Sequence, residues 1–312
     1  MRFGFTNAGV QRWRCGVCCV SGTRVRPDNR PRIWKVRLTA WLTNPETLTK
    51  QSNRWGVDRR TANRGFASLW AREIPAPFLS VEDKALVLDA TSIAPDLVVL
   101  IARTPDDGGL SWRFAERESY ESWRALLSRV ADTPRGVVSD AQKGLKKAIR
   151  ERFPDVPVQR CMIHVMRRAL AWITKRPKTE AGRTLRVMVT AVPRVWSEYE
   201  ARAWTNLFLR WCIQYQHFLS ERTVSVDGRS AWYTHRKLRQ TSSLLRRSIP
   251  ELFTYTIFPG IPRTTNHVEG GINAGVAEVI RRHRGLSSTQ KKTAVALFLS
   301  KRRGRKSTRN VS

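Results

Sequence analysis

Three acidic residues constrain the fold of this chain more than any other feature. Asp89 ends the apolar run 85–88, Asp140 ends the run 136–139, and Glu269 opens a helical stretch. Buried strands read as short continuous apolar runs, and a polar residue at the end of such a strand tends to face a cleft. Three carboxylates that converge on one cleft hold hard divalent cations such as Mg²⁺. Two such ions about 4 Å apart clamp the attacking and leaving oxygens of a phosphodiester. The pattern therefore predicts metal-assisted cutting or joining of nucleic acid.

The charge of the chain points to a polyanionic partner. Among 312 residues, 57 are Lys or Arg and 25 are Asp or Glu, so the net charge is +32. A compact chain with this charge repels itself unless a polyanion offsets the charge, and DNA is the obvious candidate. A ribosomal or chromatin-like basic protein is the alternative, but such proteins are usually shorter and contain less Trp than the 12 found here.

The cysteines and the apolar stretches predict the compartment. Five cysteines are an odd number and make no disulfide framework. Residues 1–14 lack the apolar core of a signal peptide, and no apolar stretch approaches the length of a membrane span. We expect a cytoplasmic, nucleoid-associated protein with no membrane contact.

Residues 1–30 are predicted to form a partial zinc-ribbon-like N-terminus. Cys15 and Cys18 have the spacing of one zinc knuckle, with Cys19 beside them. A tetrahedral zinc site needs a second pair of ligands, and nothing upstream offers one. We therefore expect no stable zinc, and we expect the first half of the ribbon to belong upstream of Met1.

Residues 31–75 are predicted to form a small helical module of the helix-turn-helix type. Apolar spacing indicates helices over 33–42 and 48–55, and Asp58 is placed to cap a third helix. In a helix-turn-helix the basic second helix enters the major groove of DNA, although a plain packing module has the same pattern. The candidate DNA contacts are Arg59, Arg60 and Asn63.

The order of elements from residue 82 to residue 161 predicts an α/β fold. Three strands (86–93, 96–104 and 110–118) are followed by a helix (120–130), a strand (136–140), a helix (143–153) and a strand (156–161). This is the layout of a ribonuclease H-like fold. Its first and fourth strands lie side by side, so we expect Asp89 and Asp140 to meet there.

Residues 162–262 show no strand pattern and are predicted to be an all-helical insertion. The predicted helices span 162–174, 179–192, 196–222 and 232–249. Residues 263–300 return to the catalytic core with helices over 269–283 and 289–300, and residues 301–312 form a basic tail. Tryptophans at helical spacing are expected in the core of the insertion, although an exposed one could stack on a flipped base; they are Trp172, Trp196, Trp204 and Trp211.

Short motifs lie along residues 85–300. They are Asp89-Ala90-Thr91, Ser139-Asp140-Ala141, Gln159-Arg160-Cys161-Met162-Ile163-His164, Thr265-Asn266-His267-Val268-Glu269-Gly270-Gly271-Ile272-Asn273 and Arg282-His283-Arg284-Gly285-Leu286-Ser287. Each is weak alone, but the combination resembles the mutator-like DDE transposases of bacterial insertion sequences. The N-terminal segment 11–15 with Cys18 resembles the second half of a zinc ribbon found in related elements.

The resemblance implies a transposase that binds the terminal inverted repeats of its own transposable element. Asp89, Asp140 and Glu269 would then be the catalytic residues and the ligands of Mg²⁺ or Mn²⁺. Water would hydrolyse a strand at the transposon end, and the freed 3′-hydroxyl would attack target DNA. The partners would be double-stranded DNA, both ends and target, and further copies of the chain in a homodimer or higher oligomer.

Two alternatives remain beside the transposase. One is a ribonuclease H-like DNA nuclease or resolvase, and the other is an inactive, truncated remnant that only binds DNA. The helical insertion and the N-terminal module favour the transposase. A DNA-binding repressor with a degenerate catalytic domain is a further alternative, but it would lack one of the carboxylates, and all three are present.

Three auxiliary residues accompany the carboxylates. The resemblance implies that Cys161 and His164 form a Cys-x-x-His element beside the active site. His164 would lie close to substrate phosphate or support Asp140; the alternative is a packed cysteine with a hydrogen-bonded histidine. Asn266 is expected to cap the helix that carries Glu269.

Overall fold

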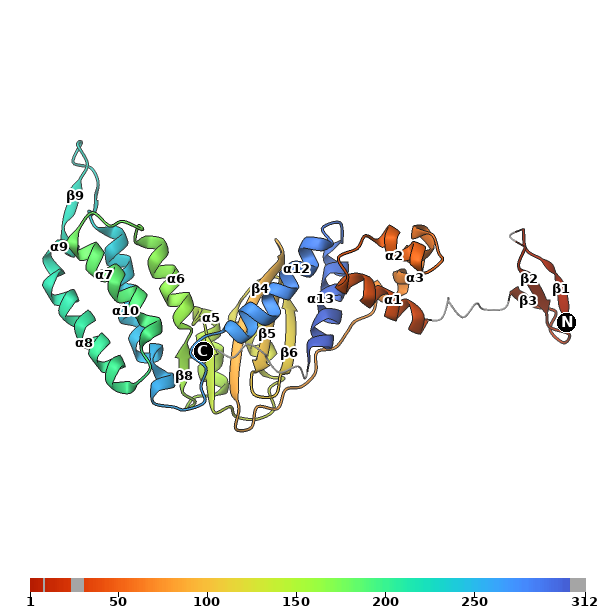
Figure 1. The fold of residues 1–312 in the computed structure, drawn as a ribbon, viewed down its shortest axis with the longest axis horizontal. Coiled ribbons are helices and arrows are strands. Elements are labelled where there is room, and N and C mark those ends of the chain that lie inside the picture. Colours follow the sequence, from red (N-terminus) through yellow and green to blue (C-terminus); the bar gives the residue numbers. More distant parts are fainter. Residues whose placement is uncertain (8, 24–30, 304–312) are drawn as a thin grey trace. The chain divides into compact units, whose positions relative to one another are not determined.

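The computed structural model describes residues 1–7, 9–23 and 31–303, which form two compact units (Figure 1). The first unit contains the described residues of Met1–Ile74 together with Glu278–Phe298, and the second contains Pro75–Ala277 and residues 299–303. The sequence placed 263–300 together with the catalytic core, whereas the contacts place most of its second half with the N-terminal helices. Nearly all of the predicted tail 301–312 lies outside the described residues.

A small antiparallel sheet opens the first unit. Its strand order is β1-β2-β3, with β1 at Arg2–Phe5, β2 at Gln11–Arg14 and β3 at Ser21–Thr23. The exposed thiols of Cys15, Cys18 and Cys19 lie between β2 and β3. The knuckle-like segment is therefore a hairpin connection, and residues 24–30 of the expected ribbon lie outside the described residues.

Helices α1 (Pro31–Thr43), α2 (Leu48–Arg54) and α3 (Arg59–Trp70) follow. Phe66 of α3 is fully buried and stacks on Trp41 at 5.9 Å between ring centroids. Asp58 caps α3 as predicted, because its Oδ1 accepts the Thr61 amide at 2.7 Å. The Thr293 hydroxyl donates to the Trp70 carbonyl at 3.1 Å, which ties the 278–298 segment to this unit.

A mixed sheet of five strands forms the centre of the second unit, in the order β6-β5-β4-β7-β8. Strand β4 pairs antiparallel with β5 and parallel with β7, so the prediction that the first and fourth strands are neighbours is confirmed. The bounds are β4 Ala85–Ala94, β5 Leu97–Thr104, β6 Gly109–Ala115, β7 Gly136–Ser139 and β8 Val158–Arg160.

Helices α4 (Tyr120–Leu127) and α5 (Lys143–Arg152) cover one face of this sheet. Trp123 of α4 and Leu145 of α5 are fully buried in one core with Leu86, Leu88 and Leu100 of the strands. The predicted alternation of strand and helix is thus borne out, and this packing fixes the ends of β4 and β7 relative to each other.

The insertion builds a second apolar core of its own from helices. Trp204 and Trp211 are buried there as predicted and each stacks on Phe208, whereas the Trp196 side chain is 60% exposed. The helices are α6 Met162–Trp172, α7 Glu180–Ala191, α8 Glu198–Gln214, α9 Gln216–Ser220 and α10 Arg236–Leu252, with short 3₁₀ turns at Val192–Arg194 and Thr254–Thr256.

The prediction that the insertion is entirely helical is wrong. Strands β9 (Arg222–Val224) and β10 (Ala231–Tyr233) form a hairpin that stands out from the helices (Figure 1). β-branched and aromatic residues favour these strands, and Gly228 adopts the positive φ of +68° that the turn needs. The hairpin lies mostly in the gap between the predicted helices 196–222 and 232–249 and overlaps only their ends.

The chain then returns to the sheet through α11 (Asn266–Val268) and a π-helical turn, η4 (Glu269–Asn273). Helices α12 (Ala274–Arg282) and α13 (Ser288–Arg302) follow. None of the described helices is long and apolar enough to cross a membrane.

Candidate active site

Asp89 and Asp140 lie at the same level on neighbouring parallel strands. Val87 of β4 pairs with Val138 of β7, so the position two residues beyond each partner holds an aspartate. Asp140 follows β7 directly and accepts the Gln142 amide at 3.0 Å. The pairing of the two strands therefore places both carboxylates at the carboxyl end of β7, as the sequence predicted.

The backbone after Asp140 is strained. Ala141 has a φ of +61°, in the left-handed region that residues with a side chain rarely adopt. The Ser139 hydroxyl accepts the Ala141 amide at 3.2 Å and helps to hold this conformation. Strain of this kind is common where a side chain must be aimed at a site, and here it turns the chain directly after a candidate ligand.

Glu269 reaches the same region from the far side of the insertion. It lies in the π-helical turn η4, which packs against β4. One turn later, Asn273 donates from Nδ2 to the Asp89 Oδ2 atom at 2.8 Å. The negative charges of Asp140 and Glu269 both raise the pKa of Asp89, so the three predicted carboxylates share one electrostatic environment.

Asp89 is the carboxylate most affected by this environment. Burial, together with the charges of Asp140 and Glu269, raises the pKa of Asp89 to about 7, against the opposing effects of His164 and the Ala90 amide. The side chain is only 8% exposed. Buried carboxylates of this kind favour binding of a proton or a cation because either one removes the isolated charge.

Cys161 and His164 form a hydrogen-bonded group with Thr265. The Thr265 amide and hydroxyl both lie 3.3 Å from the Cys161 Sγ atom, and His164 Nδ1 lies 3.5 Å from that hydroxyl. The hydrogen bond to Cys161 and the charges of Cys161, Asp89 and Glu269 raise the pKa of His164 to about 9, although burial opposes this. His164 is therefore a cation at neutral pH beside the carboxylates.

The pKa of the Cys161 thiol is lowered, whereas that of His164 is raised. Burial raises the pKa of Cys161, but hydrogen bonds from His164 and Thr265 and the charge of His164 outweigh it, so the pKa is lowered. The structure shows the packed cysteine and the hydrogen-bonded histidine, whereas contact of His164 with substrate phosphate stays a prediction. Cys161 is a packed, hydrogen-bonded residue, and His164 lies within electrostatic reach of Asp89.

The expected capping role of Asn266 is wrong. Thr265 occupies the N-cap position of α11 without a side-chain cap of its own, and Asn266 is an exposed residue at the first helical position whose amide donates to the Thr264 hydroxyl at 3.3 Å. The Thr265 carbonyl instead accepts the amides of Val268 and Glu269 at 2.8 and 2.9 Å. The chain turns one residue earlier than expected because Thr265 is buried against Cys161.

Several cationic side chains near the carboxylates were not identified as site residues from the sequence. Arg167 makes an ion pair with Glu269, and it lines a cavity of about 340 Å³ together with Asp140, Arg160, His164 and Arg168. Arg167 stands three residues after His164 on α6, a spacing that puts both on one helical face. Asn273 follows Glu269 by four residues, and this helical spacing could have indicated in the same way that it lies near the site.

Among the described residues, three side-chain oxygens on the elements that carry the candidate carboxylates are buried without a hydrogen-bond donor. They are Glu269 Oε2, Asn273 Oδ1 and Gln142 Oε1. Mg²⁺ and Mn²⁺ prefer such carboxylate and carbonyl oxygens. In the protein without metal, Arg167 neutralises Glu269. Within the described residues, no three His, Cys, Asp or Glu side chains lie close enough together to hold one ion.

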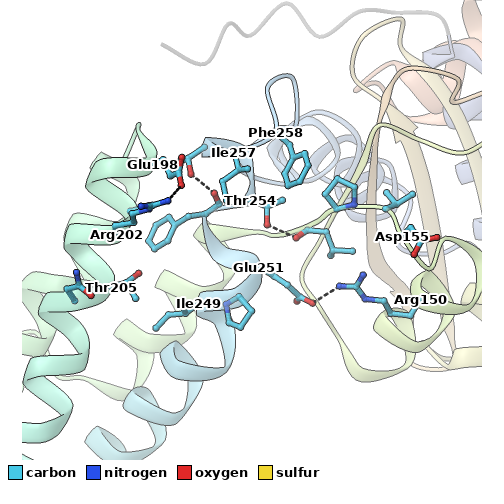
Figure 2. A pocket seen from close by; sticks show the side chains of 18 residues that line it. Arg150, Asp155, Glu198, Arg202, Thr205, Ile249, Glu251, Thr254, Ile257 and Phe258 are labelled. Carbon is cyan, nitrogen blue, oxygen red and sulfur yellow. Dashed lines mark hydrogen bonds and ion pairs between the residues drawn. The ribbon is translucent and has the colours of Figure 1, made fainter.

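A larger cavity of about 770 Å³ lies where the insertion meets β8 (Figure 2). Glu251 is buried at its base and bridges Lys146 and Arg150, while Thr254 donates to the Val158 carbonyl at 2.8 Å. None of the three candidate carboxylates lines this cavity. Its contacts join the insertion to the edge of the sheet.

The candidate DNA contacts Arg59, Arg60 and Asn63 are all exposed, on the first turns of α3. Asp58 and the buried Phe66 fix this helix at its start and along its inner face. The three side chains are thus exposed, and their contact with DNA stays a prediction.

Comparison with known proteins gives one family. Residues 99–221 match the family model described as "Transposase, Mutator family". A transposase for insertion sequence element ISRM5 of Rhizobium meliloti (strain 1021) is 25% identical over 205 residues, or 60% of this chain and 50% of that protein. A transposase for insertion sequence element IS406 of Burkholderia multivorans (strain ATCC 17616 / 249) is 28% identical over 221 residues, or 68% of this chain and 50% of that protein. The chain spans about half the length of these curated relatives.

Proposed function

The chain belongs to the Mutator family of transposases, and we propose that it is a DDE transposase. It binds the terminal inverted repeats of its insertion sequence and catalyses metal-dependent cleavage and transfer of DNA strands. The observation that carries this proposal is the placement of Asp89 and Asp140 on paired parallel strands, with Glu269 in a turn that packs against the first of these strands.

The order of the strands and the N-terminal helices also support the proposal. The strand order β6-β5-β4-β7-β8, with β4 parallel to β7, is the arrangement expected of a ribonuclease H-like catalytic domain. The three helices α1 to α3, with a capped and exposed basic α3, fit a helix-turn-helix-like DNA-binding module.

The carboxylates Asp89, Asp140 and Glu269 would hold one or two Mg²⁺ or Mn²⁺ ions, which when bound supply Lewis-acid chemistry for in-line displacement at phosphorus. Asn273 orients the Asp89 carboxylate through its hydrogen bond to Oδ2. Arg167 keeps Glu269 neutralised until the site is filled. Arg160, His164 and Arg168, which line the cavity beside Asp140, offer positive charge to the phosphates of the bound strand.

Both chemical steps use the same residues. In the first, water attacks a phosphodiester at the transposon end, one P–O bond forms, and the bond to the 3′-oxygen breaks. In the second, the freed 3′-hydroxyl attacks a phosphodiester of the target and forms a new P–O bond. The bond from that phosphorus to the 3′-oxygen of the target strand breaks, a target 3′-hydroxyl leaves, and the protein carries no covalent intermediate. Two ends must be processed together, so we propose that a homodimer or higher oligomer assembles on the DNA.

DNA binding is expected to weaken steeply as salt increases. A chain of net charge +32 that neutralises six to ten phosphates should lose roughly a thousandfold or more in affinity between about 50 and 200 mM salt, because bound counterions are released from DNA. Fluorescence anisotropy with a labelled duplex measures this dependence. Equal affinity across that range would refute the role assigned to the basic surface.

The function is tested with the DNA that flanks the coding region. If inverted repeats occur there, purified protein with Mg²⁺ should cut duplexes that carry them and join the new 3′ ends to plasmid DNA. Cut products without joined products would favour the alternative, a ribonuclease H-like nuclease or resolvase. Binding without any cutting would favour an inactive, truncated remnant.

A further inference from the structure

The motif Arg282–Ser287 has no role in the chemistry described above. It connects α12 to α13 and lies in the first unit. The His283 side chain is 8% exposed, and its ring centroid lies 4.5 Å from that of Trp41 in an edge-to-face contact. Burial lowers the pKa of His283, so this ring is neutral and acts as an anchor. The loop is therefore fixed on α1.

The end of the loop is fixed as well. The Leu286 amide donates to the His283 carbonyl at 3.1 Å. The Ser287 amide donates to Gln290 Oε1 at 3.0 Å, and the Gln290 amide donates to the Ser287 hydroxyl at 3.3 Å, which is a reciprocal cap of α13. A loop held at both ends presents its exposed side chains in a defined geometry.

The loop, α3 and residues 45–49, which include Glu46, line a groove of about 770 Å³. Its apolar lining includes Trp41, Trp70 and Leu286, and its polar rim includes Arg59, Asn63 and Arg284. Arg59 and Asn63 stand one turn apart on the same face of α3, and Ala67 extends that face along the groove. Arg60 is not among the lining residues, so the structure separates it from the other two candidate DNA contacts.

The charge of the groove is positive on both sides. Arg282 is neutralised by Glu278 at 2.5 Å, and Glu46 by Arg54 at 2.6 Å. Among the described residues, no carboxylate pairs with Arg59 or Arg284, which are exposed on opposite rims. Arg284 donates from Nε to the Arg281 carbonyl at 3.2 Å, which orients its guanidinium.

We propose that this groove binds the sugar–phosphate backbone of duplex DNA, with Arg59 and Arg284 contacting phosphates from its two sides. Guanidinium groups match the geometry of phosphate oxygens, and the apolar lining accommodates deoxyribose. The DNA-binding surface of the first unit is thus completed by a segment that lies more than 200 residues downstream of α3. This inference rests on the proposed DNA binding, and it extends that proposal to the role of the loop.

The test uses the full chain and a labelled mixed-sequence duplex, because backbone contacts do not depend on sequence. Affinity is measured against salt concentration for Arg59→Ala, Arg284→Ala and the double variant. Each single change should reduce the slope of log affinity against log salt by about 0.9, and the double change by about 1.8. Near 0.1 M salt, each should weaken binding by roughly tenfold.

Two further variants separate the groove from the general charge of the chain. Lys35 is exposed on α1 and does not line the groove, so Lys35→Ala removes the same charge and should leave the slope unchanged. Ala67→Trp fills the groove at an exposed position without changing the charge, and it should weaken binding and lower the slope. Thermal unfolding confirms that each variant is folded.

A wild-type slope in Arg284→Ala, an equal loss in Lys35→Ala, or normal binding by Ala67→Trp would each overturn the groove assignment while leaving DNA binding intact. If the unaltered chain bound no duplex at low salt, the proposed function itself would fail together with the groove. The two failures are therefore distinguishable in the same titration.

Discussion

Asp89→Asn should abolish DNA cleavage and strand transfer, with a loss of at least about a thousandfold in rate. The change removes the negative charge from a candidate metal ligand, and several kcal/mol of transition-state stabilisation are lost with it. The hydrogen-bond acceptor for Asn273 is kept, because the amide oxygen replaces the Asp89 oxygen. A strand-transfer assay with a labelled transposon-end duplex and plasmid measures the effect.

The control for this substitution is Asp96→Asn. Asp96 is an exposed residue in the turn between β4 and β5, so its replacement should leave the rate unchanged. DNA binding should be intact in both variants, since it rests on the basic surface. Cleavage by Asp89→Asn at the wild-type rate would remove Asp89 from the catalytic site.

In the metal-free protein, the contribution of Asp89 to the free energy of unfolding should fall by about 3 kcal/mol as the pH rises from about 4 to about 7. The cause is Asp89, whose pKa is raised from 3.8 to about 7 by burial and by the charges of Asp140 and Glu269. Within this window the unfolded chain has released the proton that the folded chain still holds. The stabilisation that protonated Asp89 gives the folded chain is therefore present at low pH. It is lost as the pH rises through about 7, the pKa of Asp89 in the folded chain. Urea unfolding at a series of pH values measures it.

Asp89→Asn should lack this part of the pH dependence, so the variant should be more stable than the unaltered chain at pH 8 without metal. His164 also has a raised pKa, about 9. Its contribution to the free energy of unfolding is therefore lost as the pH rises from about 6.5 to about 9. Subtracting the variant from the unaltered chain gives the contribution of Asp89 together with its coupling to His164, whose pKa the Asp89 charge raises. Parallel stability profiles for the two chains would contradict a buried, destabilised carboxylate at this position.

The elements that carry a strong local pattern were predictable from sequence. The apolar runs that precede Asp89 and Asp140 are neighbouring strands because β-branched and aliphatic residues are buried on both faces of the central sheet. The N-cap of Asp58 was also predictable, because capping depends on a few adjacent residues. These signals are local, and they placed two of the three carboxylates.

What depends on long-range packing was not predictable. The ion pair of Arg167 with Glu269 joins residues 102 positions apart, and no spacing in the sequence reveals it. Thr265 displaced Asn266 from the cap position because it is buried against Cys161, a contact between distant segments. The segment 278–298 packs with the N-terminal helices through His283 and Thr293, which no periodicity could show.

The most direct test of the central claim is to change the metal preference through the proposed ligands. Asp89→Cys, Asp140→Cys and Glu269→Cys each replace hard oxygens with a thiolate, which binds Mg²⁺ poorly and softer ions such as Mn²⁺ better. We predict that each variant is inactive in strand transfer with Mg²⁺ and regains measurable activity with Mn²⁺, as expected if all three side chains contact the metal. A cysteine variant that remains fully active with Mg²⁺, or one that stays inactive with both ions while still folding and binding DNA, would contradict metal ligation by that residue.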